Sequence, residues 1–113
     1  MKNEIIEGDC LEVMQDIEGG SIDMILCDLP YGTTACSWDS IIPLEPLWEQ
    51  YERIIKKDSA IVLTGIQPFT SKIIISNLDM FKYTLVWQKS KISHFAQAPY
   101  RFLTQNNDIC VFS

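Results

Sequence analysis

The chain has 113 residues, of which 47% are hydrophobic, and its formal net charge at pH 7 is −6. This composition fits one packed domain, or part of a larger one, and argues against disorder. No apolar run approaches the roughly 18 residues that span a bilayer, and acids interrupt residues 1–20, where a signal peptide would be apolar. We therefore expect a cytoplasmic protein with no membrane partner.

The four cysteines are Cys10, Cys27, Cys36 and Cys110, and no two of them have a Cys-x-x-Cys spacing. His94 is the single histidine that could join them as a ligand. Zinc sites usually draw on closely spaced pairs of such residues. The sequence therefore predicts free thiols in a reducing compartment and no metal site.

The first third of the chain predicts two strands around a helix. Residues 4–7 read as a short strand, and Leu11, Met14 and Ile17 recur at helical spacing until the glycines at 19 and 20 end that helix. The apolar run 22–27 reads as a buried strand.

The rest of the chain continues this alternation. We expect a loop at 33–42, a helix that starts at Pro43, a strand at 60–63, a helix from Pro68 to 77, a strand at 83–87, a long loop at 89–106 and a last strand at 109–112. Strands that alternate with helices predict an α/β fold, with a mostly parallel sheet and flanking helices.

Residues 28–32, Asp-Leu-Pro-Tyr-Gly, directly follow the buried strand at 22–27. Ligands of open α/β sheets bind at the carboxyl ends of strands. Asp28 can accept hydrogen bonds from an amino group, Pro30 stiffens the loop, Tyr31 offers a flat face for a base, and Gly32 permits close approach. The alternative is a plain turn in which the acid caps and the tyrosine packs.

The charge is unevenly distributed along the chain. Residues 1–81 hold 5 Lys or Arg against 14 Asp or Glu, whereas residues 82–113 hold 4 against 1. Aromatic residues lie between the cations of this basic end, and such a mixture suits contact with phosphates and bases. An ordinary solvated surface is the alternative.

Residues 28–31 resemble the Asp-Pro-Pro-Tyr signature of amino-group DNA methyltransferases, with Leu29 at the second position. Gly8-Asp9-Cys10 resembles the segment of this family that binds the adenine of S-adenosylmethionine. The resemblance implies that Asp9 accepts from the exocyclic amine, that the backbone N–H of Cys10 reaches a ring nitrogen, and that Asp28 also borders the cofactor. A helix N-cap is the alternative role for Asp9.

Further segments extend the resemblance over nearly the whole chain. Residues 28–39 are similar to the active-site loop of prophage-type members, Thr64-Gly65 to the motif that shapes the base pocket, and Trp87-Gln88-Lys89 to a Trp-x-Lys motif. Asn106-Asn107 departs from the adjacent His-Glu that is frequent in the family. The substrate-binding residues that the resemblance implies are Tyr31, Gly32, Thr33, Trp38, Lys89 and Arg101.

The family also needs a glycine-rich cofactor loop, and none of the five glycines here forms a Gly-x-Gly. One class of these enzymes is permuted, so that the Asp-Pro-Pro-Tyr motif precedes the target-recognition region and the cofactor loop. By this resemblance, residues 1–113 are the N-terminal catalytic part of such a domain and lack both later parts. The fold would then be a partial Rossmann-like methyltransferase fold, and its partners would be DNA and either the missing half of the enzyme or a second copy.

The implied chemistry is methyl transfer from S-adenosylmethionine to a base in DNA, as in restriction-modification systems. Asp28, with the Pro30 neighbourhood, would accept hydrogen bonds from the amine and localise its lone pair. Alignment can supply roughly 7–11 kcal/mol of a barrier, and stacking on Tyr31 would offset part of the cost of flipping the base. An acid at the first motif position favours adenine N6. The alternatives are cytosine N4, an RNA or protein-glutamine substrate, and an inert remnant or partner-binding half-domain.

Overall fold

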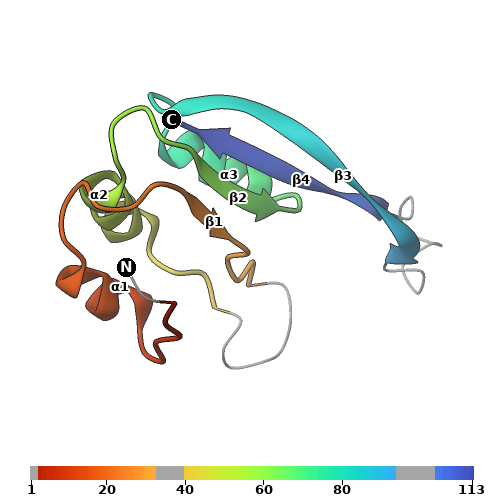
Figure 1. Cartoon of the computed structure of the whole chain (residues 1–113). Helices are drawn as coiled ribbons and strands as arrows, with labels where there is room; N and C mark the ends of the chain where they lie inside the picture. The colour runs from red at the N-terminus through yellow and green to blue at the C-terminus, as the bar shows by residue number, and fades with distance from the viewer. Residues whose placement is uncertain (1–2, 33–39, 94–103) are drawn as a thin grey trace.

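The computed structural model describes residues 3–32, 40–93 and 104–113, and Figure 1 shows the whole chain. In chain order the elements are α1 (Cys10–Val13), the 3₁₀ turn η1 (Met14–Asp16), β1 (Ile25–Cys27), α2 (Leu44–Ile54), β2 (Ile61–Gly65), α3 (Phe69–Ser76), β3 (Phe81–Ser93) and β4 (Thr104–Phe112). No helix in these described ranges is both long and apolar enough to cross a membrane.

The strands form one sheet in the order β1-β2-β4-β3. β1 pairs with β2 in parallel, whereas β4 is antiparallel to both of its neighbours, β2 and β3. Three strands therefore run in one direction and β4 runs against them. The predicted α/β class and the partial Rossmann-like fold are confirmed. The prediction of a mostly parallel sheet was wrong: only β1 and β2 pair in parallel, because β4 lies between β2 and β3 and is antiparallel to both (Figure 1).

Of the helices described, α2 is the one whose start and buried face are most clearly encoded in the sequence. It begins directly after Pro43, whose fixed φ suits a helix start. Its apolar side chains then recur every three or four residues, and Leu47, Trp48, Tyr51 and Ile54 are all buried. The amphipathic stripe therefore fixes which side of α2 faces the sheet.

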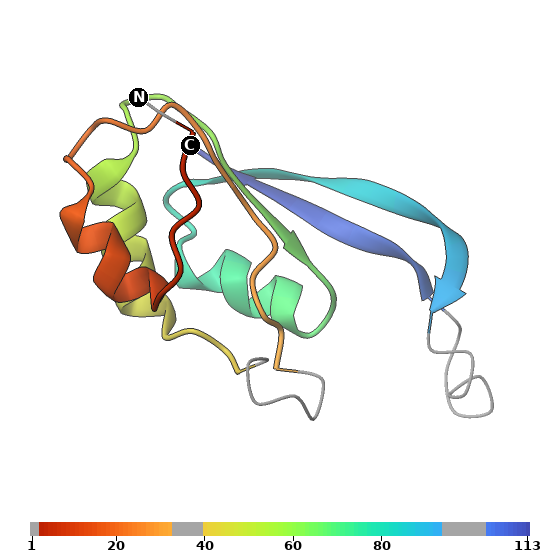
Figure 2. The ribbon, with the colours of Figure 1, turned by 60° about the horizontal axis from the view of Figure 1, so that its bottom comes forward.

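The core lies between the sheet and the helices. Along β2 the side chains alternate, so that Ile61 and Leu63 are fully buried while Val62 is only half-buried. Phe112 of β4 is also fully buried, and its ring centroid lies 4.7 Å from that of Trp48 in α2. In Figure 2, α2 and α3 lie on the same side of the sheet. One face of the sheet therefore carries the core.

Two sequence-based predictions of secondary structure were wrong. Residues 4–7 form no strand, since they have no strand partner in the described part of the chain, and Ile5 is fully exposed. The predicted loop at 89–106 was wrong at both ends, because residues 89–93 belong to β3 and 104–106 to β4; residues 94–103 lie outside the described residues. Before Asp108, β4 pairs with β3 and not with β2, so this part of the two strands does not need the apolar pattern of a buried strand.

Candidate active site

Asp28 follows the last residue of β1, and its carboxylate is anchored on one side. Tyr31 Oη donates to Asp28 Oδ1 at 2.9 Å, and Thr64 Oγ1 donates to the same oxygen at 2.6 Å. Within residues 3–32, 40–93 and 104–113, Oδ2 accepts no hydrogen bond, and Asp28 is exposed. Two hydroxyls therefore orient a carboxylate whose second oxygen can accept from a ligand.

Tyr31 ties this carboxylate to the core. Its ring centroid lies 5.2 Å from that of Phe69, with a tilt of 33° between the planes, and Phe69 is only 2% exposed. Burial raises the pKa of Tyr31 to about 12; the nearby polar side chains of Thr64 and Asn107 oppose this shift, and Asp28 adds to it. The phenol is therefore neutral near pH 7 and remains a hydrogen-bond donor.

The sheet brings Thr64 and Asn107 to this site. Thr64 lies near the end of β2, beside β1, and its oxygen is 2.9 Å from Tyr31 Oη. Asn107, in β4, is 8% exposed and lies near enough to Tyr31 to favour its phenolate and lower its pKa. Thr64 could be found from the sequence, since it lies at a strand end as Asp28 does. Asn107 was noted only as a departure from a family pattern, so its position near Tyr31 was missed.

The segment predicted to hold a cofactor adenine meets the same end of β1. Asp9 Oδ1 accepts from the Leu11 N–H at 2.9 Å, so Asp9 is the N-cap of α1. Burial raises the pKa of the Cys10 thiol, as do the nearby groups Asp9 and Cys27. Cys10 therefore lies close to Cys27, which immediately precedes Asp28.

The capping role of Asp9 was the alternative in the sequence analysis, and the structure shows it directly. The second carboxylate oxygen of Asp9 accepts no hydrogen bond in the described part of the chain, and the residue is exposed. This oxygen could accept from an exocyclic amine without breaking the cap. The capping bond therefore leaves room for the predicted contact of Asp9 with the adenine of S-adenosylmethionine, which stays a prediction.

The other residues of the motif have structural roles. Leu29 is 4% exposed and belongs to the core cluster, while Pro30 is half-buried. Gly32 has φ +72°, and a Cβ there would lie 2.9 Å from Ile41 Cγ1. Gly32 is therefore required by a left-handed turn and by the close approach of Ile41.

The remaining predicted site residues cannot be placed as side chains. Lys89 lies in β3, and its side chain is not described. Thr33, Trp38 and Arg101 lie outside the described residues. In the described part of the chain, no three His, Cys, Asp or Glu side chains are grouped to hold a metal ion.

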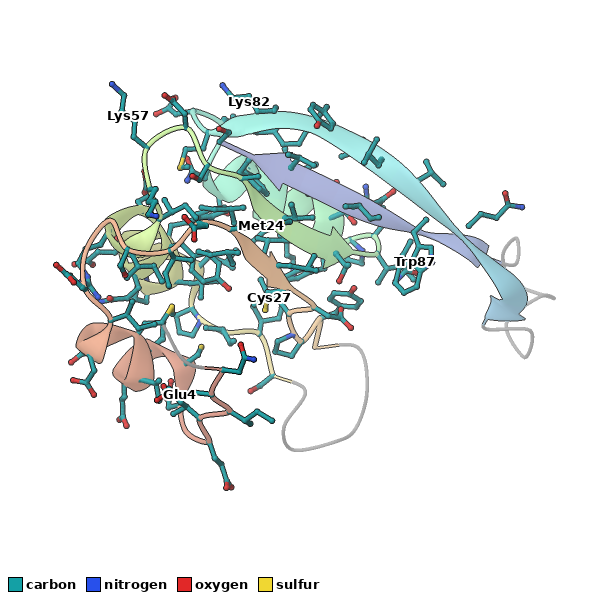
Figure 3. All side chains as sticks on the ribbon, viewed as in Figure 1. Glu4, Met24, Cys27, Lys57, Lys82 and Trp87 are labelled. Carbon is teal, nitrogen blue, oxygen red and sulfur yellow. The ribbon has the colours of Figure 1, made fainter. Side chains whose placement is uncertain are left out.

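Figure 3 relates this site to the rest of the sheet. Cys27 lies at the end of β1 that leads into Asp28, whereas Met24 precedes the strand at its other end. Trp87 projects from β3 near the end of β2, where it pairs with Asn107. The acid and the phenol that follow β1 and the indole of β3 therefore lie toward the same end of the strands, although β1 and β3 are the two outer strands of the sheet.

No family model and no curated protein matches the chain. Among solved structures, it resembles TTHA0409 from Thermus thermophilus, which is named as a candidate DNA modification methylase. That likeness has a TM-score of 0.65 at 19% identity and covers 93% of this chain and 50% of the other. It also resembles the PvuII DNA methyltransferase, which is cytosine-N4-specific, with a TM-score of 0.68 at 15% identity over 94% of this chain and 47% of the other.

The likeness defines the fold of the chain. Residues 1–113 have the fold of about half of each of these two methyltransferase structures. Both pairs are under 20% identical, so the likeness by itself carries no activity, substrate or partner to this chain.

Proposed function

We propose that the chain is the N-terminal catalytic part of an amino-group DNA methyltransferase of the permuted class, which methylates the exocyclic N6 of adenine. One observation carries the proposal. The exposed Asp28 carboxylate stands at the carboxyl end of β1, with Oδ1 held by two hydroxyls and Oδ2 accepting nothing in the described part of the chain. Two DNA methyltransferase structures share the fold around it.

In this proposal Asp28 acts as a hydrogen-bond acceptor for the target base. Oδ2 would accept from the exocyclic N–H, which localises the nitrogen lone pair, and the Pro30 carbonyl would be a second acceptor. The hydroxyls of Tyr31 and Thr64 fix the carboxylate before the base arrives, so little reorganisation is needed during the reaction. Tyr31 packs against Phe69 and would stack with the base through its other ring face.

S-adenosylmethionine would supply an activated methyl group on a sulfonium. Asp9 and Cys10 would hold its adenine, and Asp28 would border it. Gly32, Thr33 and Trp38 would line the base pocket, and Lys89 and Arg101 would contact DNA phosphates. An enzyme with this activity would act in the cytoplasm, as part of a restriction-modification system or a prophage.

Nucleoside mass spectrometry of DNA from cells that express the natural gene tests the proposal. The expected product is N6-methyladenine, and Asp28→Ala should remove it. Asp23→Ala is the matched control, since Asp23 is an exposed acid that pairs with Lys56 on the surface. Methylation of neither base by the folded protein would contradict the proposal and favour an inert remnant.

Cytosine N4 is the second candidate, because the PvuII neighbour is cytosine-N4-specific. A carboxylate can accept from either exocyclic amine, so Asp28 alone does not separate the two bases. N4-methylcytosine without methylated adenine in the same experiment would replace the adenine assignment and keep the role of Asp28.

A further inference from the structure

The first turn of α3 is hydrogen-bonded to β4 through a pair of side chains. Thr70 Oγ1 donates to Asp108 Oδ2 at 2.8 Å, across 38 positions of the chain. Thr70 is 3% exposed and Asp108 is half-buried. A hydrogen bond to a carboxylate is stronger than one between neutral groups, and the loss of either partner leaves the other unsatisfied. The pair therefore ties the start of α3 to the sheet.

Gly65 allows Thr70 to reach this carboxylate. It is the last residue of β2 and pairs with Asp108 in the neighbouring strand. A Cβ at position 65 would lie 2.7 Å from Thr70 Oγ1 and 3.3 Å from Thr70 Cα. Because the second of these atoms belongs to the backbone, a side-chain rotation would not relieve the contact. The start of α3 therefore packs directly on the backbone at the carboxyl end of β2.

The cap of α3 gives this helix start little support of its own. Pro68 is the N-cap residue and makes no side-chain capping hydrogen bond. The Ser71 N–H is bonded by Gln67 Oε1 at 3.2 Å, but this contact is exposed. An exposed contact of this length stabilises less than a partly buried bond to a carboxylate. The position of the first turn therefore depends on Thr70 and Asp108.

Phe69 connects this turn to the candidate site. It precedes Thr70 in the chain, is 2% exposed, and has its ring centroid 5.2 Å from that of Tyr31. Tyr31 Oη in turn donates to Asp28 Oδ1 at 2.9 Å. A displacement of the α3 start would therefore move the ring that supports the phenol.

The strand end under α3 makes a second connection. Thr64 directly precedes Gly65, and its hydroxyl donates to Asp28 Oδ1 at 2.6 Å. Both hydroxyls that orient the Asp28 carboxylate are thus one contact or one residue away from the elements that Thr70 and Asp108 hold together.

We propose that Asp108, acting through Thr70, is a positioning residue for the proposed methyl transfer. It joins the start of α3 to the sheet at the end of β2, so that Tyr31 and Thr64 hold the Asp28 carboxylate in the orientation that the reaction needs. The inference deepens the proposed function and rests on it for the reaction that Asp108 serves. Asp108 is not among the causes that shift the pKa of Tyr31, so its effect on the phenol passes through packing.

Thr70→Val and Thr70→Ser test the proposal in the protein expressed from its natural gene. Valine keeps the size of threonine without its hydroxyl, whereas serine keeps the hydroxyl. In Thr70→Val the pKa of Tyr31 should fall from about 12 toward 10.0, because the phenol loses part of its burial. The kcat for methyl transfer should fall roughly 10-fold or more at a nearly unchanged KM, since alignment is lost and not binding. Thr70→Ser should restore both values.

Two substitutions of the acid give an independent reading. Asp108→Asn keeps a carbonyl oxygen that can accept from Thr70, so it should leave the pKa of Tyr31 and kcat close to normal. Asp108→Leu removes the acceptor and should match Thr70→Val. Thr84→Val is the matched control, because Thr84 is an exposed threonine of β3, and it should change neither value.

Normal values of both quantities in a folded Thr70→Val or Asp108→Leu protein would overturn the proposal. Equal losses in Asp108→Asn and Asp108→Leu would also overturn it, because the charge of Asp108 and not its hydrogen bond to Thr70 would then matter.

The two readouts separate this inference from the proposed function. A pKa of Tyr31 that falls in Thr70→Val, in a protein that methylates no DNA, would overturn the proposed function and keep the coupling between α3 and Tyr31. Methyl transfer that requires Asp28 but is unaffected by Thr70→Val would do the reverse.

Discussion

The two sides of the candidate site, which we propose hold the base (the base side, around Asp28) and the cofactor (the cofactor side, around Asp9), are built in different ways. On the base side, Asp28 is held by Tyr31 and Thr64, and Tyr31 in turn packs on the buried ring of Phe69. On the cofactor side, the one hydrogen bond of the Asp9 side chain in the described residues goes to Leu11, two residues away. The orientation of Asp28 is therefore fixed by the sheet and the core, whereas that of Asp9 is fixed by a local turn.

This difference shows which part of the chemistry residues 1–113 can organise alone. A group that must stabilise a reacting amine has to be oriented in advance, and only packing and hydrogen bonds from several elements achieve that. The base side meets this condition through β1, β2, β4 and α3. The cofactor side has a cap and a short helix, so its geometry depends on whatever packs against residues 3–9.

The largest expected effect tests whether the core supports the base side. Phe69→Ala should lower the free energy of unfolding by about 3–5 kcal/mol, because it removes a buried ring and leaves a cavity under Tyr31. Ile6→Ala, on the cofactor side, should change it by less than about 0.5 kcal/mol, since Ile6 is exposed. Urea unfolding measures both, and equal effects would remove the contrast between the two sides.

The next effect concerns activity. In the complete enzyme, Asp28→Ala should reduce methyl transfer by roughly 10²–10³-fold or more, as the loss of one preoriented transition-state contact does. Asp23→Ala should leave the rate unchanged, because its carboxylate pairs with Lys56 on the surface. Single-turnover rates with labelled methyl donor give the comparison. A folded Asp28→Ala protein of near-normal rate would remove this residue from the site.

A third effect reports on the hydrogen bonds around Tyr31. Its pKa is raised from 10.0 to about 12, first by burial and then by the nearby Asp28. Asp28→Asn should lower the pKa, whereas Thr64→Val should raise it, because the Thr64 hydroxyl stabilises the phenolate. Ultraviolet titration, read as the difference from Tyr31→Phe, isolates this phenol. Unchanged values in both variants would mean that the hydroxyl and carboxylate groups are not coupled in solution.

The same shift sets the sign of the pH dependence. A folded-state pKa above the unfolded value adds stability that is fully present below pH 10 and is lost as the pH rises toward about 12. Burial also raises the pKa of Cys110, from 9.0 to about 11, so the stability that this thiol contributes is lost over an overlapping but lower range of pH. Tyr31→Phe should therefore flatten, without abolishing, the loss of stability over this range.

On the base side, the sequence predicted the features that lie within one element. It did not predict the contacts that the sheet makes between distant residues. The apolar run before Asp28 correctly predicted a strand with the acid at its end, and the periodic face of α2 was also predicted correctly, because both signals lie within one element. The prediction that this strand is buried was wrong, since Leu26 is 70% exposed. The contact of Tyr31 with Phe69 joins residues 38 positions apart in the numbering, and Asn107 is further still. A local hydrophobic pattern cannot predict contacts between residues so far apart in the chain, since the order of the strands depends on the packing of the whole sheet.

The wrong strand at residues 4–7 has a different cause. Its residue types favour a strand, but a strand exists only when a neighbour accepts and donates its hydrogen bonds. Within the described residues no such neighbour is present, so the same isoleucines lie exposed. The strand propensity of residues 4–7 was therefore judged correctly. A local pattern cannot show whether a second strand is present to pair with this segment.

The smallest expected effect tests the cofactor side. Asp9→Ala removes the N-cap of α1 and should lower the free energy of unfolding by about 0.5–2 kcal/mol, while Asp9→Asn or Asp9→Ser should largely keep it. For cofactor binding, residues 1–113 alone should bind S-adenosylmethionine weakly or not at all, because they offer only the adenine end. In the complete enzyme, Asp9→Ser should then weaken cofactor binding although the cap is preserved. Calorimetry decides: tight binding to residues 1–113, or normal affinity of the complete Asp9→Ser enzyme, would leave Asp9 as a cap alone.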